Sequence, residues 1–278
     1  MDLVDTHQHI WDLDRFPYSW CAAIPELNRS FLFSDYAAAS AGLGIAKTVF
    51  VECDVDEPNA LAEARMIQEL ADRHRSIAGI VASGRPEREG FGAHLERLAR
   101  LPGVRGVRRV LHTQPDELSR EPGFAENIRL LREFGFSFDL CVLARQLPQA
   151  VGLVRQCPEV SFILDHCGVP DVKGRALDPW RALIAELASL PNVTCKISGL
   201  VAYADPANWT AGDLRPWVEH VLAQFGWDRV VWGGDWPVCT TAATLAQWVE
   251  ATRELTRLAS DDEREKLFRG NAERVYRI

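Results

Sequence analysis

Short runs of β-forming residues alternate with helical patterns from one end of the chain to the other, with no change in composition that would mark a linker. Eight runs are predicted strands: residues 3–10, 47–53, 77–82, 104–110, 137–142, 161–166, 193–198 and 229–233. Strands that alternate with helices form parallel βαβ units, and apolar runs such as VVW and FIL are typical of strands covered on both faces. We therefore expect an α/β fold, a single (β/α)8 barrel that takes up residues 1–278.

The helical segments carry readable start and stop signals. Residues 59–74 have apolar side chains at helical spacing, and residues 124–134 end at Gly135, a common helix C-terminal residue. Asp178 before Pro179 is an expected N-cap, and Ser260 with Glu263 has the spacing of a capping box. These helices separate the predicted strands as a barrel requires.

The main alternative is a doubly wound open sheet. That fold favours a glycine-rich phosphate turn after its first strand, whereas this chain has DTHQHIW at residues 5–11 and contains neither G-x-G-x-x-G nor a P-loop. One longer connection follows the first strand, at residues 11–33. Long loops in compact domains are often binding loops, so we expect this segment to lie over the mouth of the barrel.

Composition excludes several classes of function. The chain has 278 residues with 47% hydrophobic and 25% charged residues, and its formal net charge is −8 without a block of Lys or Arg. Binding to nucleic acid or to an anionic membrane is therefore not expected, and a small-molecule partner is favoured. The chain shows no secretory pattern and no run of 18 apolar residues, so we expect a cytoplasmic protein. Its seven cysteines are then expected to be reduced and buried. We also expect a monomer or small homo-oligomer.

Polar residues stand at four predicted strand ends, where barrels of this type hold their active sites. His7 and His9 are two apart, so both imidazoles can point to the same face of a strand. The apolar run FILDHCG ends at His166, Gly-Gly precedes Asp235, and Lys196 lies in the strand TCKIS. For each of these there is a purely structural alternative: a hydrogen-bonded buried histidine, a helix N-cap for Asp235, or an ion pair for Lys196.

These motifs together resemble the amidohydrolase superfamily. The opening DTHQHIWD, then LDHCG, KISGL, WGGDWPV and the closing GNAERVY look like the branch that contains sugar-acid lactonases and 2-pyrone-4,6-dicarboxylate lactonase. The resemblance spans essentially the whole chain. It implies a catalytic set of His7, His9, His166 and Asp235 around one cavity.

The chain departs from members of the superfamily that hold two metals. They use a carboxylated Lys on the fourth strand and a His on the fifth, where this chain has VRGVRRVLH and FSFDLCV. A binuclear centre is therefore not expected. The remaining residues could hold a single Zn²⁺ through His7, His9 and Asp235 with Glu52, or the enzyme could need no metal, as is thought for the resembling lactonases.

The expected reaction is hydrolysis of a sugar-acid lactone, in which Asp235 removes a proton from water. His7 and His9 would polarise the ring carbonyl, directly or through Zn²⁺, and His166 would hold the water or stabilise the oxyanion. Substrate contacts are expected from Trp11, Trp236, His112 and Lys196, and from Arg108, although strand alternation admits only one of Arg108 and Arg109 to the interior.

The chain shows no obvious excess of Arg at the mouth, as a dicarboxylate would require, so a neutral lactone such as L-fuconolactone or another aldonolactone in sugar catabolism is favoured. Three alternatives stay open. One is a lactonase of the 2-pyrone-4,6-dicarboxylate type, another is a zinc-dependent decarboxylase of the same superfamily, and the third is a non-catalytic protein that binds a sugar acid.

Overall fold

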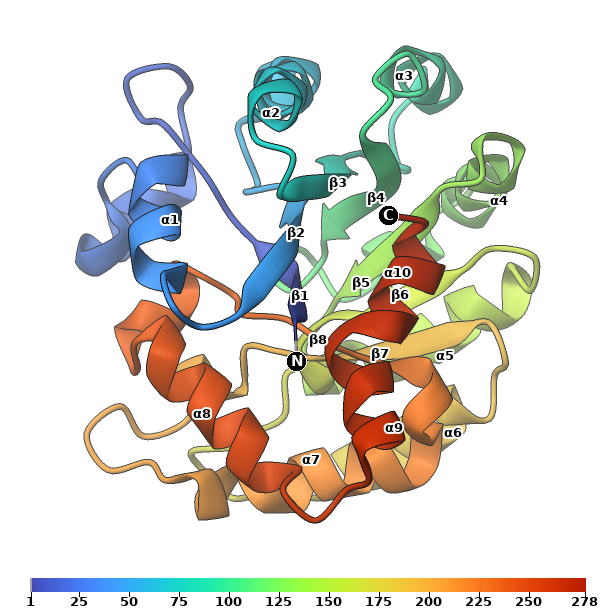
Figure 1. The fold of residues 1–278 in the computed structure, drawn as a ribbon. Helices are drawn as coiled ribbons and strands as arrows, with labels where there is room; N and C mark the ends of the chain where they lie inside the picture. Colours follow the sequence, from blue (N-terminus) through green and yellow to red (C-terminus); the bar gives the residue numbers. More distant parts are fainter. Residues whose placement is uncertain (1) are drawn as a thin grey trace.

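Eight parallel strands form the centre of the molecule, in the order β1 to β8, in a computed structural model that describes residues 2–278 (Figure 1). Each predicted strand is present, with ends that differ by a few residues. The strands are β1 Leu3–Gln8, β2 Ile45–Val51, β3 Ile77–Ser83, β4 Val104–Val110, β5 Ser137–Cys141, β6 Phe162–Leu164, β7 Val193–Ile197 and β8 Val230–Trp232.

The sheet closes on itself where β1 meets the end of β8. Gln8 forms a parallel bridge with Trp236. The Asp235 N–H donates to the His7 carbonyl at 2.7 Å, and the His9 N–H donates to the Trp236 carbonyl at 2.9 Å. An open doubly wound sheet would leave these two edges apart, so the prediction of a (β/α)8 barrel is confirmed.

Most of the helices surround the strands on the outside of the barrel, and Figure 1 shows these as an outer ring, whereas the last helix lies over one end of the barrel. None of them within residues 2–278 is both long and apolar enough to cross a membrane. They are α1 Phe33–Ser40, α2 Ala60–Arg73, α3 Phe91–Leu98, α4 Phe124–Phe134, α5 Leu147–Gln156, α6 Trp180–Ala188, α7 Ala211–Phe225, α8 Leu245–Leu255, α9 Asp261–Glu265 and α10 Asn271–Tyr276.

The expected helix caps have different outcomes. The capping box at Ser260 and Glu263 is confirmed, because each side chain bonds the other residue's backbone N–H. The N-cap expected of Asp178 is wrong. Pro179 occupies the cap position of α6 without a side-chain bond, and the Asp178 carboxylate pairs instead with Arg181 at 2.8 Å.

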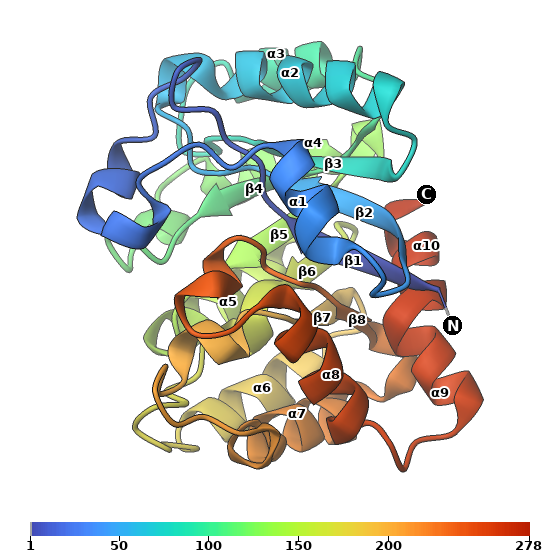
Figure 2. The same cartoon turned by 60° about the vertical axis from the view of Figure 1, so that its left-hand side comes forward.

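Alternate residues of each strand face the interior of the barrel and the helices, as the period of a β-strand requires. On β2, Val49 and Val51 pack inside with Tyr276 of α10, whereas Phe50 packs into the layer under the helices. α10 therefore closes one end of the barrel, near both chain termini. Residues 11–33 lie at the opposite end of the barrel (Figure 2).

All seven cysteines are buried and free, as expected.

Candidate active site

His7 and His9 present their Nε2 atoms to one another at the carboxyl end of β1, 3.1 Å apart. His9 Nδ1 lies 2.7 Å from the Val51 carbonyl. A carbonyl oxygen only accepts hydrogen bonds, so His9 carries its proton on Nδ1 and leaves a lone pair on Nε2. The two-residue spacing thus places both rings on one side, as the sequence predicts.

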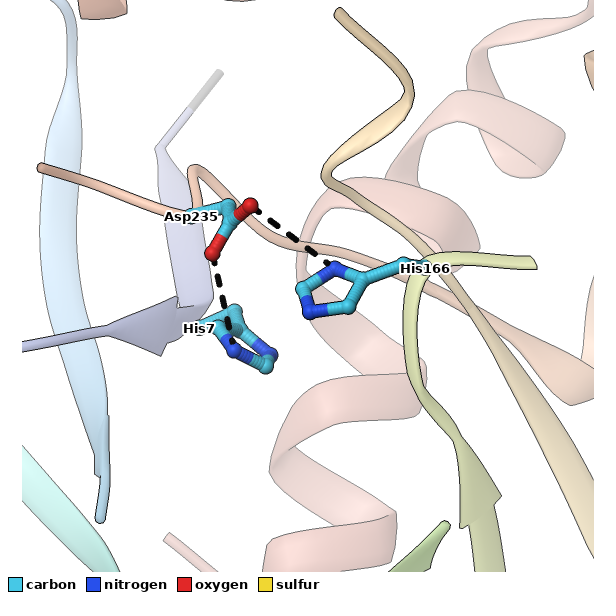
Figure 3. A group of neighbouring side chains, drawn as sticks. All are labelled: His7, His166 and Asp235. Atoms are coloured by element: carbon cyan, nitrogen blue, oxygen red, sulfur yellow. Dashed lines mark ion pairs between the residues drawn. The ribbon is translucent and has the colours of Figure 1, made fainter. Parts of the chain in front are cut away.

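Asp235 faces these two rings from the segment after β8. Its Oδ1 lies 3.7 Å from His7 Nε2 (Figure 3). The same oxygen lies 3.6 Å from His9 Nε2. The two preceding glycines allow this approach, because a Cβ would lie 2.7 Å from His7 Cβ at Gly233 and 2.6 Å from Asp5 Oδ2 at Gly234. Asp5 draws the same strands together, since its Oδ1 accepts the backbone N–H groups of His7 at 3.0 Å and Gly234 at 2.7 Å.

His166 completes the group on the other side of Asp235. Its Nδ1 lies 3.9 Å from Asp235 Oδ2 and 2.9 Å from Ser198 Oγ. The ring reaches this place through a strained turn after β6, where His166 and Cys167 have φ of 53° and 54°. Such strain is typical of functional sites, and here it turns the imidazole toward Asp235 (Figure 3).

Arg108 is the arginine of β4 that enters the site. Its Nε donates to Glu52 Oε1 at 2.8 Å, and its Nη1 lies 3.3 Å from His7 Nε2 and 3.4 Å from Asp165 Oδ2. Arg109 points the other way and pairs with Glu87 at 2.8 Å. The choice that strand alternation left open is therefore settled by the register of β4.

A pocket of about 470 Å³ opens above these groups. His9, Arg108, His166 and Asp235 line it, together with His112 and Trp11. Segment 11–33 contributes further apolar side chains to the wall. These are Trp20, Ala23, Ile24 and Leu27.

Four other predicted residues lie outside the lining. His7 is fully buried beneath it, with its Nε2 3.1 Å from His9 Nε2. Lys196 is fully buried and contacts His7 from the interior, and the Glu52 carboxylate is occupied by Arg108. Trp236 packs against Phe31 and Tyr36 rather than against the pocket.

Burial sets the charges at the floor of the pocket. It raises the pKa of Asp235 to about 6, and together with the positive charge of Arg108 it lowers the pKa of His9 to about 3. Burial also lowers the pKa values of His7 and His166. At neutral pH the group therefore consists of one carboxylate among neutral imidazoles, which suits either a general base or a bound cation.

The same atoms meet the requirements of a single zinc ion. Ligand atoms about 2.0–2.1 Å from a tetrahedral zinc lie about 3.3 Å apart. The Nε2 atoms of His7 and His9 and Oδ1 of Asp235 are separated by 3.1, 3.6 and 3.7 Å. His166 is near enough to act as a further ligand, because His7, His166 and Asp235 form a buried cluster with ligand atoms within 4.8 Å.

Two carboxylates of the site received no role from the sequence. Asp139 and Asp165 each lie 2.8 Å from Lys196 Nζ. The sequence does contain a signal for both: Asp139 lies inside the apolar strand FSFDLC, and Asp165 lies at the end of FILD. A buried carboxylate in such a run needs a partner.

Comparisons with known proteins agree with this geometry. The sequence model described as "Amidohydrolase" matches residues 4–278. An L-fucono-1,5-lactonase of Burkholderia multivorans is 33% identical over 99% of this chain and 96% of its own, and the protein y4mH of Sinorhizobium fredii is 29% identical over 99% and 98%. A crystal structure of a B. multivorans amidohydrolase with bound zinc is similar over the full length of both chains, with a TM-score of 0.90 at 29% identity.

Proposed function

Given that the chain belongs to the amidohydrolase family, we propose that it is a carboxylic-ester hydrolase that opens the lactone of a sugar acid. One observation carries the proposal. A buried Asp235 carboxylate with a pKa of about 6 lies at the floor of the pocket among His7, His9 and His166, with the Arg108 guanidinium beside them. A base and a cationic donor on one cavity floor are what water attack on an ester carbonyl requires.

In the proposed reaction a water molecule beside Asp235 attacks the ring carbonyl carbon while Asp235 accepts its proton. The carbonyl oxygen becomes an oxyanion, and Arg108 Nη1 with the imidazole of His166 stabilises its charge. The ring C–O bond then breaks, and Asp235 returns the proton to the departing ring oxygen. The product is the open hydroxy acid, and Asp235 ends the cycle as a carboxylate.

Zinc fits the residues of this floor, and when bound it supplies a Lewis acid that polarises the carbonyl and lowers the pKa of water. His7, His9 and Asp235 would hold it, with His166 beside them. The chain's own residues hold the arrangement described above, in which Asp235 faces the imidazoles and the Arg108 guanidinium is held by Glu52.

The favoured substrate is L-fuconolactone or a related aldonolactone. Two relatives that match nearly the whole chain are named L-fucono-1,5-lactonase, and one that matches 63% of it is named L-rhamnono-gamma-lactonase. Arg108 is the one arginine among the lining residues, which favours a neutral ring over a dicarboxylate. Trp20, which is partly exposed in the lining, offers its indole to a sugar face, and the buried Trp11 ring packs against it. The reaction would belong to cytoplasmic sugar catabolism and be carried out by a monomer or small homo-oligomer.

The test is proton release from a panel of five- and six-membered sugar lactones, measured with purified protein of known zinc content. The proposal expects opening of at least one aldonolactone well above the spontaneous rate. CO₂ release from an aromatic acid without opening of any lactone would favour the decarboxylase. Tight binding of a sugar acid without turnover would favour a binding protein.

A further inference from the structure

Segment 11–33 forms an apolar wall of the candidate active-site pocket. All five residues that it contributes to the lining are apolar: Trp11, Trp20, Ala23, Ile24 and Leu27. Apart from the residues of the pocket floor, the polar side chains of the lining come from other segments. These are Asp54, His112, Thr113, Tyr203 and Thr241. The lining therefore differs in character between this segment and the rest of the pocket.

The local backbone explains why these side chains form one surface. Two short 3₁₀ helices, Ser19–Ala23 and Pro25–Leu27, follow one another and are joined at Ile24. Side chains three residues apart eclipse one another in a 3₁₀ helix, so Trp20 and Ala23 lie on the same face. The same spacing separates Ile24 from Leu27, and all four line the pocket.

The polar atoms of this wall already have partners within the protein. Trp20 Nε1 donates to the Cys53 carbonyl at 2.7 Å, which ties the wall to the connection between β2 and α2. Trp11 Nε1 donates to the Arg29 carbonyl, also at 2.7 Å. Neither indole N–H is therefore available to a ligand, and what the side chains of the wall offer is apolar surface.

Ile24 is the exposed aliphatic residue of this wall. It is 37% exposed, whereas Leu27 and Trp11 are buried. A single exposed aliphatic side chain is common on protein surfaces, but this one lines the pocket together with the partly exposed Trp20 indole. We therefore expect a bound ligand to cover it with an apolar group.

The chemistry of sugar-acid lactones limits which group this can be. Their ring carbons carry hydroxyl groups, and the terminal carbon is the one that can end as a methyl group. A hydroxyl placed against the wall would lose its bound water without gaining a partner, whereas a methyl group would only remove apolar surface from water. The wall is thus suited to a lactone that ends in methyl rather than in hydroxymethyl.

We propose that Ile24, together with the Trp20 indole, is a specificity-determining residue that binds the terminal methyl group of a 6-deoxy sugar-acid lactone. The inference rests on the proposed lactonase function. It assigns the choice between deoxy and hydroxylated substrates to segment 11–33, while the chemistry remains with Asp235 at the floor of the pocket.

L-fuconolactone and L-galactonolactone test the inference, because they differ only in their terminal group, which is methyl in the first and hydroxymethyl in the second. With lactones of equal ring size, wild-type kcat/KM should favour L-fuconolactone by about 10–10²-fold, the range that an apolar pocket reaches against an added hydroxyl. Ile24→Asn should largely abolish this preference, since an amide can bond the hydroxyl. The matched control is Leu32→Asn, the same exchange at an exposed residue of the same segment outside the lining, which should keep the wild-type ratio.

The other outcomes separate this inference from the proposed function. Lactone opening with equal kcat/KM for the two substrates would overturn the inference alone, as would an unchanged preference in folded Ile24→Asn or an equal loss in Leu32→Asn. No opening of any sugar lactone would overturn the proposed function as well. Circular dichroism establishes folding, and Ile24→Ala, which shortens the side chain without adding a polar group, should weaken the preference if Ile24→Asn does not fold.

Discussion

The guanidinium of Arg108 is held in place by Glu52, which accepts from Nε through its carboxylate at 2.8 Å and from Nη2 through its backbone carbonyl. This arrangement directs Nη1 toward the floor of the site, 3.3 Å from His7 Nε2 and 3.4 Å from Asp165 Oδ2. Glu52 thus fixes the direction of the charge that Arg108 offers to a substrate. A planar guanidinium can make these contacts together, whereas an ammonium cannot.

Arg108→Lys should therefore lower kcat/KM by about 10²–10³-fold, the usual cost of an oxyanion donor, while the fold is retained. The matched control is Arg109→Lys, one residue along β4, where the side chain pairs with Glu87 outside the pocket. Steady-state kinetics on an opened lactone measures both. Equal losses in the two variants would remove Arg108 from the reaction.

Asp235→Asn should reduce kcat by at least about 10²–10⁴-fold, because an amide cannot accept the proton of the attacking water. The exchange keeps the size of a buried side chain, so the melting temperature should change little. Full activity in soluble Asp235→Asn protein would show that another group is the base.

Zinc should raise the melting temperature of the metal-stripped protein, since a ligand that binds only the folded state stabilises it, by about 2.7 kcal/mol at a hundred times Kd. His9→Gln should abolish this shift because it removes one of three converging ligand atoms. His112→Gln, in the same pocket but bonded to Cys141 Sγ at 3.0 Å, should preserve it. An undiminished shift in His9→Gln would place the metal elsewhere.

Glu63 gives the fold a pH dependence that lies outside the metal site. It is a buried residue of α2 whose carboxylate accepts from Tyr18 of segment 11–33 at 3.0 Å, and burial raises its pKa from 4.5 to about 8. The unfolded chain loses this proton near pH 4.5, whereas the folded chain keeps it to about pH 8. The free energy of unfolding should therefore fall as pH rises between these values, by a few kcal/mol.

Glu63→Gln is neutral at every pH and still offers Tyr18 an acceptor. Chemical denaturation between pH 5 and 9 should show the variant gaining stability relative to wild type up to about pH 8 and a constant difference above it. A difference that does not change with pH would mean that Glu63 is ionised in the folded protein.

Much of this architecture could be predicted because the strands are buried on both faces, so apolar runs such as FIL and VVW stand out between helical patterns. The polar strand ends were equally visible. Which of Arg108 and Arg109 enters the barrel was not, because that depends on the register of β4 with its neighbours. Trp236 lies beside Asp235 in sequence, yet Phe31 and Tyr36 surround its ring, a contact between distant segments that no local pattern reveals.

The interior charges were the least predictable part of the site. Lys196 was open between an ion pair and a substrate contact, and the structure pairs it with Asp139 of β5 and with Asp165, the residue that follows β6. Pairing of this kind is decided by how three strands are staggered around the barrel. The sequence of any one strand shows only one member of such an ion pair.

The central claim is that water opens a lactone at Asp235, and hydrolysis of L-fuconolactone in H₂¹⁸O tests it most directly. Wild-type protein should open the ring well above the spontaneous rate and place one ¹⁸O in the new carboxylate, and Asp235→Asn at equal zinc content should do neither above background. No acceleration by the wild-type protein on this or any other sugar lactone, or equal acceleration by Asp235→Asn, would contradict the account.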